Sequence, residues 1–163
     1  MRRGREIAIA AVAVSLLGVA GCGGGSGGAS SQASAEKASL TRQEWVDKAN
    51  EICHDASEKK VAKMTAYQNA HDYNVGEPSV HEREAVNTSV VLPNVQERIE
   101  ALEALPVPPG EEAKIRAILR SMESGIREAE AHPENLAIPK QPIPFKESEH
   151  LAGAYGLLFC GMP

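Results

Sequence analysis

The chain has 163 residues, of which 17 are basic and 22 are acidic, and its formal net charge is −5. A prior of about 100–200 residues per domain indicates one folded domain. The acidic balance disfavours nucleic acid as a partner, because phosphate binding requires a concentrated basic face. Apolar residues make up 42% of the chain, which excludes a wholly disordered protein.

The N-terminus has the features of a secretory signal peptide. Three arginines, Arg2, Arg3 and Arg5, precede an almost unbroken apolar run over residues 7–20. A basic start followed by an apolar stretch of about 7–15 residues is typical of export signals. A membrane-spanning helix requires about 20 apolar residues, so this shorter run predicts a signal rather than a span.

The apolar run ends in small residues directly before a cysteine, in the order Leu17-Gly18-Val19-Ala20-Gly21-Cys22. This stretch resembles the lipobox of bacterial lipoprotein signal peptides. The resemblance implies cleavage between Gly21 and Cys22 and attachment of a diacylglyceryl group to the Cys22 thiol, often with a further acyl chain on its amine. Two or more acyl chains hold a protein stably on a membrane. We therefore expect the protein on the extracytoplasmic side of the cell membrane, tethered through Cys22. The alternative is a secreted protein whose signal ends near a cysteine by chance.

A linker follows the expected cleavage site. Residues 23–39 are dominated by glycine and serine and contain no apolar residue larger than alanine. A chain of 17 residues with this composition has a typical reach of roughly 20–25 Å. We interpret residues 1–21 as the signal peptide, 22–39 as the lipidated cysteine and its linker, and 40–163 as the folded domain. The mature chain carries 14 basic and 21 acidic residues, a net charge of −7. Anionic headgroups repel such a body, so the lipid must hold it.

The folded domain opens with a strong helix start. Thr41 and Glu44 have the spacing of a capping box, and Leu40 and Trp45 flank it where a hydrophobic staple would lie. Since no proline or glycine intervenes before Gly76, the pattern predicts one long helix over residues 41–72. The apolar residues that recur there at helical spacing are Trp45, Ala49, Ile52, Cys53, Ala56, Met64 and Tyr67.

A second helical pattern follows a break at residues 74–78. Ser79 and Glu82 form another possible capping box. Pro93 lies inside the pattern and should kink the helix or divide it into two segments. The apolar stripe comprises Leu92, Val95, Ile99, Leu102 and Leu105, and a proline-rich run over residues 106–110 ends it.

Two more helical segments complete the domain. Glu111 and Glu112 place negative charge where a helix dipole favours it, and the apolar stripe that follows ends at His132-Pro133. Four prolines in the range Pro133–Pro144 predict an extended connector, which could also serve as a docking segment. The third stripe comprises Ile115, Ile118, Leu119, Met122, Ile126 and Ala129, and the last, over residues 145–159, comprises Leu151, Tyr155, Leu158 and Phe159. Together the four amphipathic segments predict an all-α fold, a small antiparallel bundle of about four helices.

Two cysteines remain if Cys22 carries lipid. An even number outside the membrane favours one disulfide, between Cys53 in the first helix and Cys160 at the end of the last. In an up-down-up-down bundle those helices are neighbours, and Gly153 and Gly156 would allow a close approach. The alternative is two free thiols or a redox pair, although no C-x-x-C spacing is present.

Two Glu-x-x-His elements have the spacing that ferritin-like di-metal bundles use. They are Glu51 with His54 in the first helix and Glu147 with His150 in the last. Helical geometry turns Glu51 and His54 about 140–160° away from the apolar stripe of their helix. Glu147 lies nearer its own stripe, but His150 does not. Because ligands that face water cannot converge in a core, we predict no metal site.

The other candidates for chemistry have simpler explanations. His71, His81 and His132 lie near the ends of predicted helices, where a cationic imidazole can interact with the helix dipole. The chain contains no phosphate-binding loop, no haem-attachment motif and no Gly-x-Ser-x-Gly elbow. We therefore predict no catalytic residue and no cofactor.

A second, looser resemblance spans the domain. Its residues are Trp45 with Ala49-Asn50-Glu51-Ile52-Cys53, and Tyr155-Gly156-Leu157-Leu158-Phe159-Cys160-Gly161. The pattern is similar to that of small bacterial lipoproteins and exported helical proteins, and it supports the pairing of the two cysteines but implies no activity. We expect a non-enzymatic, lipid-anchored helical module of the cell envelope with an envelope protein or ligand as partner. The alternatives are a metal- or small-ligand-binding bundle and, least favoured, an envelope enzyme.

Overall fold

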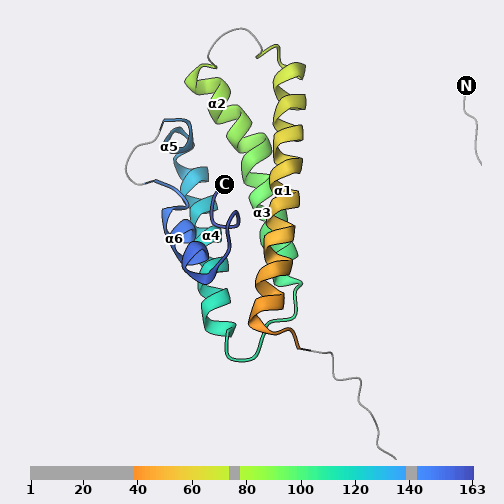
Figure 1. The fold of residues 1–163 in the computed structure, drawn as a ribbon. Coiled ribbons are helices and arrows are strands. Elements are labelled where there is room, and N and C mark those ends of the chain that lie inside the picture. Colours follow the sequence, from red (N-terminus) through yellow and green to blue (C-terminus); the bar gives the residue numbers. More distant parts are fainter. Residues whose placement is uncertain (1–38, 74–77, 139–142) are drawn as a thin grey trace, which may run out of the picture. The chain divides into compact units, whose positions relative to one another are not determined.

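The computed structural model describes residues 39–73, 78–138 and 143–163. The predicted signal peptide and Cys22, and the linker up to residue 38, lie outside them. Across the described ranges the fold is all-α, without a strand, and the prediction of a small antiparallel helical bundle is confirmed (Figure 1). The elements in chain order are α1 (Arg42–Ala70), α2 (Val80–Val86), a π-helical turn η1 (Asn87–Val91), α3 (Leu92–Glu103), α4 (Glu112–Ala131), α5 (Glu134–Ala137) and α6 (Lys146–Tyr155).

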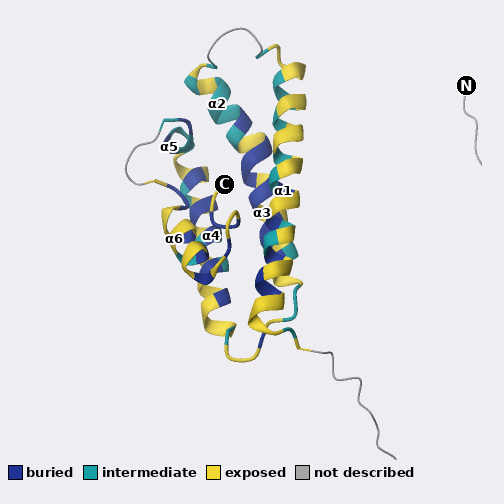
Figure 2. Ribbon diagram, viewed as in Figure 1, coloured by how far each residue is buried: buried dark blue, intermediate teal, exposed yellow. Residues whose placement is uncertain are grey.

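Helix α1 begins as its sequence predicts. The Thr41 hydroxyl accepts a hydrogen bond from the Glu44 backbone N–H, and the Glu44 carboxylate accepts one from the Thr41 N–H at 2.8 Å. This reciprocal capping satisfies donors that the first turn of a helix leaves free. The N-terminal half of α1 supplies the buried side chains, whereas Met64 and Tyr67 in the C-terminal half are only partly buried (Figure 2).

The second helical segment runs through Pro93 without a break. Ser79 and Glu82 form the predicted capping box, and α2 passes through η1 directly into α3. In η1 the Leu92 N–H donates to the Asn87 carbonyl, five residues earlier. A proline ring clashes with the carbonyl four residues before it, and a widened π turn makes room for it. Pro93 was expected to kink the helix or divide it into two segments; in the structure it is accommodated by a change of helix type in η1.

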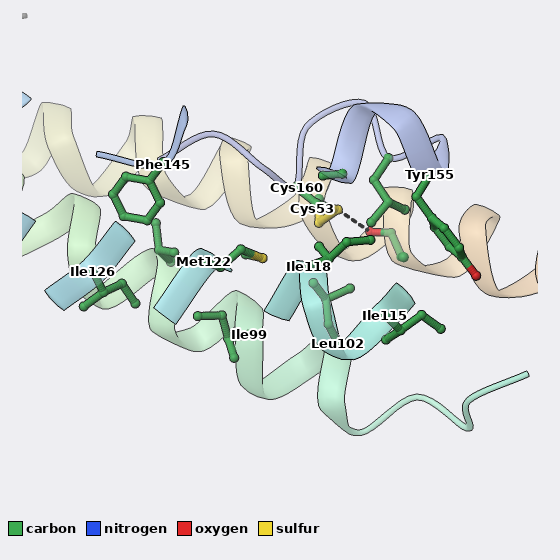
Figure 3. Packing of buried hydrophobic residues seen from close by; sticks show 14 of the residues in the cluster. Cys53, Ile99, Leu102, Ile115, Ile118, Met122, Ile126, Phe145, Tyr155 and Cys160 are labelled. Atoms are coloured by element: carbon green, nitrogen blue, oxygen red, sulfur yellow. Dashed lines mark hydrogen bonds between the residues drawn. A yellow bond between two sulfur atoms is a disulfide. The ribbon is translucent and has the colours of Figure 1, made fainter. Parts of the chain in front are cut away.

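The core lies between α1, α3, α4 and α6 (Figure 3). Helix α3 packs against both α1 and α4, and α6 packs against α4. Burying each large aliphatic side chain contributes about 1.5–3 kcal/mol, so the predicted stripes account for most of the driving force. Confirmed core members from the predicted stripes are Trp45, Ala49, Cys53, Ala56, Leu92, Val95, Ile99, Leu102, Ile115, Ile118, Met122, Ile126, Ala129 and Tyr155.

The predicted connector Pro133–Pro144 differs from an extended chain in its first half. Residues Glu134–Ala137 form one helical turn, α5, which packs against α2. Pro133 does not oppose this turn, because a proline at the start of a helix has no N–H to leave unpaired. Residues 139–142 of the connector lie outside the described residues.

The last helix is shorter than predicted. It ends at Tyr155 because Gly156 has φ +104°, a left-handed conformation that stops a helix and favours glycine. Leu158 and Phe159 are therefore not on a buried helical face: both side chains are exposed, and Leu157 is buried instead. Gly153 has open space where a Cβ would stand, so its predicted role in close packing is wrong.

The disulfide between Cys53 and Cys160 is present, and it joins α1 to the segment that follows α6. The two Cα atoms are 5.2 Å apart and both side chains are fully buried. Cys160 lies beyond the end of α6 rather than within it. The predicted contact between the first and last helices is made through Tyr155. Its ring packs edge-on against that of Trp45, with the two ring centroids 5.7 Å apart.

Replacing Cys53 and Cys160 together with alanine should lower the free energy of unfolding by about 2–5 kcal/mol, because the bridge restricts a loop of 107 residues in the unfolded chain. Urea unfolding followed by circular dichroism measures the loss. Wild-type protein in excess reductant is the control and should unfold like the double variant. Reduced protein that unfolds at the same midpoint as oxidised protein would show that the bridge carries no stability.

Candidate functional site

The C-terminal segment, residues 156–163, has no regular secondary structure, and side chains of the helices bond its backbone. Asn50 on α1 serves two of these groups. Its Nδ2 donates to the Gly156 carbonyl at 3.1 Å, and its Oδ1 accepts from the Leu158 N–H at 2.9 Å. An irregular chain packed on helices requires such partners, since unpaired backbone groups are costly to bury.

The Arg98 guanidinium, only 1% exposed, is the centre of this arrangement. Its Nη1 lies 2.6 Å from the Met162 carbonyl oxygen, 3.1 Å from that of Phe159 and 3.4 Å from that of Cys160. Its Nη2 donates to Asn94 Oδ1 at 3.1 Å. One side chain of α3 therefore holds three residues of the C-terminal segment.

Asn94 continues the network across the bundle. Its Nδ2 donates to the Ala56 carbonyl of α1 at 2.9 Å, while its Oδ1 receives Arg98. Both polar atoms of the fully buried Asn94 amide are thus bonded, which avoids the desolvation cost of an unpaired polar group. The network joins α1, α3 and the C-terminal segment at the level of the disulfide.

The charge of Arg98 is balanced by backbone dipoles. No carboxylate of the described residues forms an ion pair with it, and burial lowers the pKa of its guanidinium. Lys60 lies nearby, and its Nζ donates to the Pro163 carbonyl at 2.6 Å. Burial, and then the charge of Arg98, lower the pKa of Lys60. Backbone oxygens of the segment stabilise both cations, so a shift in the segment would leave positive charge without partners.

Helix α6 holds the other side of the segment. The fully buried Ser148 hydroxyl lies 2.5 Å from the Gly161 carbonyl oxygen and 2.8 Å from that of Phe145. A Cβ at Gly161 would lie 2.5 Å from the Ser148 carbonyl oxygen and from Glu149 Cα. Because these are backbone atoms that cannot move aside cheaply, only glycine fits at position 161. We call the groups that hold the C-terminal segment the clamp: the disulfide, Arg98, Asn94, Asn50, Ser148 and Lys60.

The polar members of the clamp were not among the candidates drawn from the sequence, but one signal was available. Arg98 stands three residues after Val95 and four before Leu102, so it shares their buried side of the helix. A charged side chain inside an apolar stripe marks a buried charge that needs partners. Which partners it meets is not encoded locally.

A groove of about 360 Å³ runs between α4 and α6. This volume is within the range of small-molecule sites, which are mostly apolar with few polar groups. Its lining is mostly apolar, with small side chains on both helices and polar groups at one end. The lining residues are Ala113, Lys114, Ala117, Ile118, Leu151, Ala154 and Tyr155.

The polar end of the groove is formed around Tyr155. The Arg42 guanidinium lies 4.7 Å from the Tyr155 ring centre and donates to the Tyr155 carbonyl at 2.6 Å. The hydroxyl is close to the Glu111 carboxylate without a well-aligned hydrogen bond. Burial and that carboxylate raise the pKa of Tyr155 to about 12. Partial burial opposes ionisation of Glu111, but Lys114, Tyr155 and Arg42 together hold its pKa below the usual value.

The structure keeps the two Glu-x-x-His elements apart. Glu51 and His54 are exposed on α1, as predicted, and the His54 ring lies 6.3 Å from that of Phe159. Glu147, expected nearer its apolar stripe, is exposed, and with His150 it lines a second groove of about 450 Å³ between α4 and α6. No group of three or more His, Cys, Asp or Glu side chains in the described ranges is arranged to hold a metal ion.

Comparison with known proteins assigns no family: no family model, no curated protein and no solved structure matches the chain. None of the helices in the described ranges is both long and apolar enough to cross a bilayer. The features of this chain that bear on function are therefore the clamp, the groove and the N-terminal sequence.

Arg98→Met should lower the free energy of unfolding by about 2–4 kcal/mol, because it leaves Asn94 and the carbonyls of the C-terminal segment without their donor. Urea unfolding measures the loss, and hydrogen exchange should show faster exchange at Leu158. The matched control is Arg127→Met, which removes an exposed guanidinium 3.9 Å from Glu123 and should change stability by less than about 0.5 kcal/mol. Equal effects of the two substitutions would contradict the role of Arg98.

Proposed function

We propose that this chain is an exported helical module of the cell envelope, anchored by lipid on Cys22, that acts by binding another molecule and not by catalysis. The observation that carries the proposal is the buried disulfide between Cys53 and Cys160. Structural disulfides persist in oxidising compartments and are rare in the cytosol of most organisms. Both sulfurs are shielded from solvent, so they are poor partners for thiol exchange.

The disulfide and the N-terminal sequence support each other. A bridge between Cys53 and Cys160 leaves Cys22 as the one remaining cysteine of the chain, at the position where the lipobox resemblance requires a thiol. The basic start, the apolar run and the small residues before Cys22 supply the other parts of such a signal. Export, acylation and disulfide formation are thus one consistent pathway.

The binding role is supported by the groove between α4 and α6. The alanines at positions 113, 117 and 154 leave the apolar surface close to the helix backbones open to solvent, and Leu151 extends it. An apolar segment of an envelope protein would bury this surface, while Lys114 and Tyr155 could orient it at one end. The volume of about 360 Å³ also favours a second candidate function, binding of a small apolar ligand.

The anchor is tested in intact cells of the source organism. The wild-type protein should fractionate with membranes, incorporate radiolabelled palmitate and lose residues 1–21, whereas Cys22→Ala should incorporate no label, because the acceptor thiol is gone. Cys53→Ala is the matched control: it also removes one cysteine but should keep the label. Recovery of unprocessed, unlabelled wild-type protein from the cytosol would overturn the proposal.

The groove is tested by filling it. Ala117→Trp places a large side chain on the exposed floor of the groove and should abolish crosslinking to a partner in intact cells. Ala131→Trp, at an exposed position at the end of α4 outside the groove lining, is the control and should leave crosslinks unchanged. Extraction of the purified protein followed by mass spectrometry distinguishes the second candidate, because a bound small ligand should be lost from Ala117→Trp alone. Unchanged crosslinks and no bound ligand in either variant would contradict a role for the groove.

A further inference from the structure

Large apolar side chains are exposed around the C-terminal segment. Leu158 is 72% exposed, Phe159 46% and Met162 43%, although the chain around them is tightly held. Val61, 61% exposed, lies on the same face of α1 as His54, two turns further along, and the His54 ring packs near Phe159. We call these four residues the apolar patch. They are four of the six large apolar side chains that are exposed in the described residues.

The clamp prevents the patch from folding inward. Leu157 and Cys160 point into the core, so the two residues between them must point outward. The carbonyls of Phe159, Cys160 and Met162 are bonded by Arg98, and the N–H of Leu158 by Asn50. An irregular segment enters an apolar environment at low cost only when its backbone groups are paired within the protein. In this segment the carbonyls of Phe159, Cys160 and Met162 and the N–H of Leu158 already have such partners.

The tether brings the patch within reach of a bilayer. His54 lies 12 residues after the start of α1 at Arg42, which is about 18 Å along the helix axis. The 17 residues between Cys22 and Leu40 have a typical reach of roughly 20–25 Å for their composition. A bilayer that holds Cys22 is therefore close enough to touch the patch. Because the inserted anchor keeps the domain at the membrane, the effective concentration of the patch at the bilayer is high, and even a weak apolar contact is populated.

A lipid surface also suits the size of the patch. A stable protein interface needs about 1,200–2,000 Å² of complementary surface, whereas the bilayer interface accepts a few protruding apolar side chains. Asn50 and Arg98 bond the backbone of the segment, and Lys60 bonds Pro163. On α1 the patch also borders the exposed carboxylate of Glu58, which lies 3.8 Å from His54 Nε2.

We propose that the apolar patch inserts into the interface of the bilayer that carries the anchor, so that the domain lies with α1 and the C-terminal segment against the membrane. This inference rests on the proposed anchor at Cys22. It leaves the groove between α4 and α6 as a separate surface for the partner.

The test replaces the lipid with an artificial tether. Mature chain with Cys22→Ser and an N-terminal polyhistidine tag is bound to phosphatidylcholine vesicles that contain a nickel-chelating lipid. Phe159→Trp reports from the patch, while the native Trp45, fully buried, gives a constant background. On tethering, the emission of Phe159→Trp should shift to the blue and be quenched by lipids that carry a nitroxide on their acyl chains.

Two variants control the measurement. Val107→Trp places the reporter at a 40% exposed apolar position in the loop between α3 and α4, away from the patch, and should show neither shift nor quenching. Leu158→Ser with Met162→Ser, added to Phe159→Trp, should abolish both signals by removing apolar area. Unchanged emission of vesicle-bound Phe159→Trp would overturn the proposal. A blue shift that depends on protein concentration and occurs without vesicles would identify a second copy of the chain as the occupant and would also overturn it.

Because the nickel tether replaces the acyl chains, a negative result here contradicts only the membrane contact. Absence of palmitate from Cys22 in cells contradicts the proposed anchor independently. The two failures are therefore distinguishable.

Discussion

The buried Arg98 guanidinium holds the C-terminal segment of this fold in place. A cation in a protein core needs compensating groups, and here these are the carbonyl oxygens of residues 159, 160 and 162 rather than a carboxylate. Their positions bring Cys160 beside Cys53 and set Leu157 into the core. The disulfide then makes this arrangement covalent. A segment without helical or sheet hydrogen bonds is thereby held against the helices by side-chain hydrogen bonds and the disulfide.

The same constraint explains why the molecule has two different apolar surfaces. The groove between α4 and α6 is concave and lined by small side chains, because alanines and not larger residues stand where the two helices meet solvent. The apolar patch protrudes, because the clamp leaves Leu158 and Phe159 no buried position. A concave surface suits an inserted segment or ligand, and a protruding one suits a lipid interface. On a tethered module the two roles need not compete, since each surface serves a different partner.

The expectations for α1, α3 and α4 were accurate to within a few residues because their signals are local. Capping at Thr41 and Ser79 depends on residues three positions apart, and each stripe depends only on helical periodicity. The end of α6 was misjudged for a different reason. A glycine inside a helical pattern is compatible with continuation, and Gly156 ends the helix because Asn50 and the core hold the following chain in another direction. The apolar periodicity of residues 157–159 therefore predicted a buried helical face, but the helix ends before these residues.

The candidate site divides in the same way. From the chain alone one can infer the helices, the all-α class, the pairing of Cys53 with Cys160 and the outward direction of Glu51 and His54, because composition, spacing and cysteine count carry that information. The Arg98 network and the exposed patch arise only when α1, α3 and α6 come together around the last eight residues, and the groove arises only when α4 packs against α6. Their contacts join positions more than 30 residues apart in the chain. Such contacts depend on how the helices pack in three dimensions, and no local pattern specifies that packing.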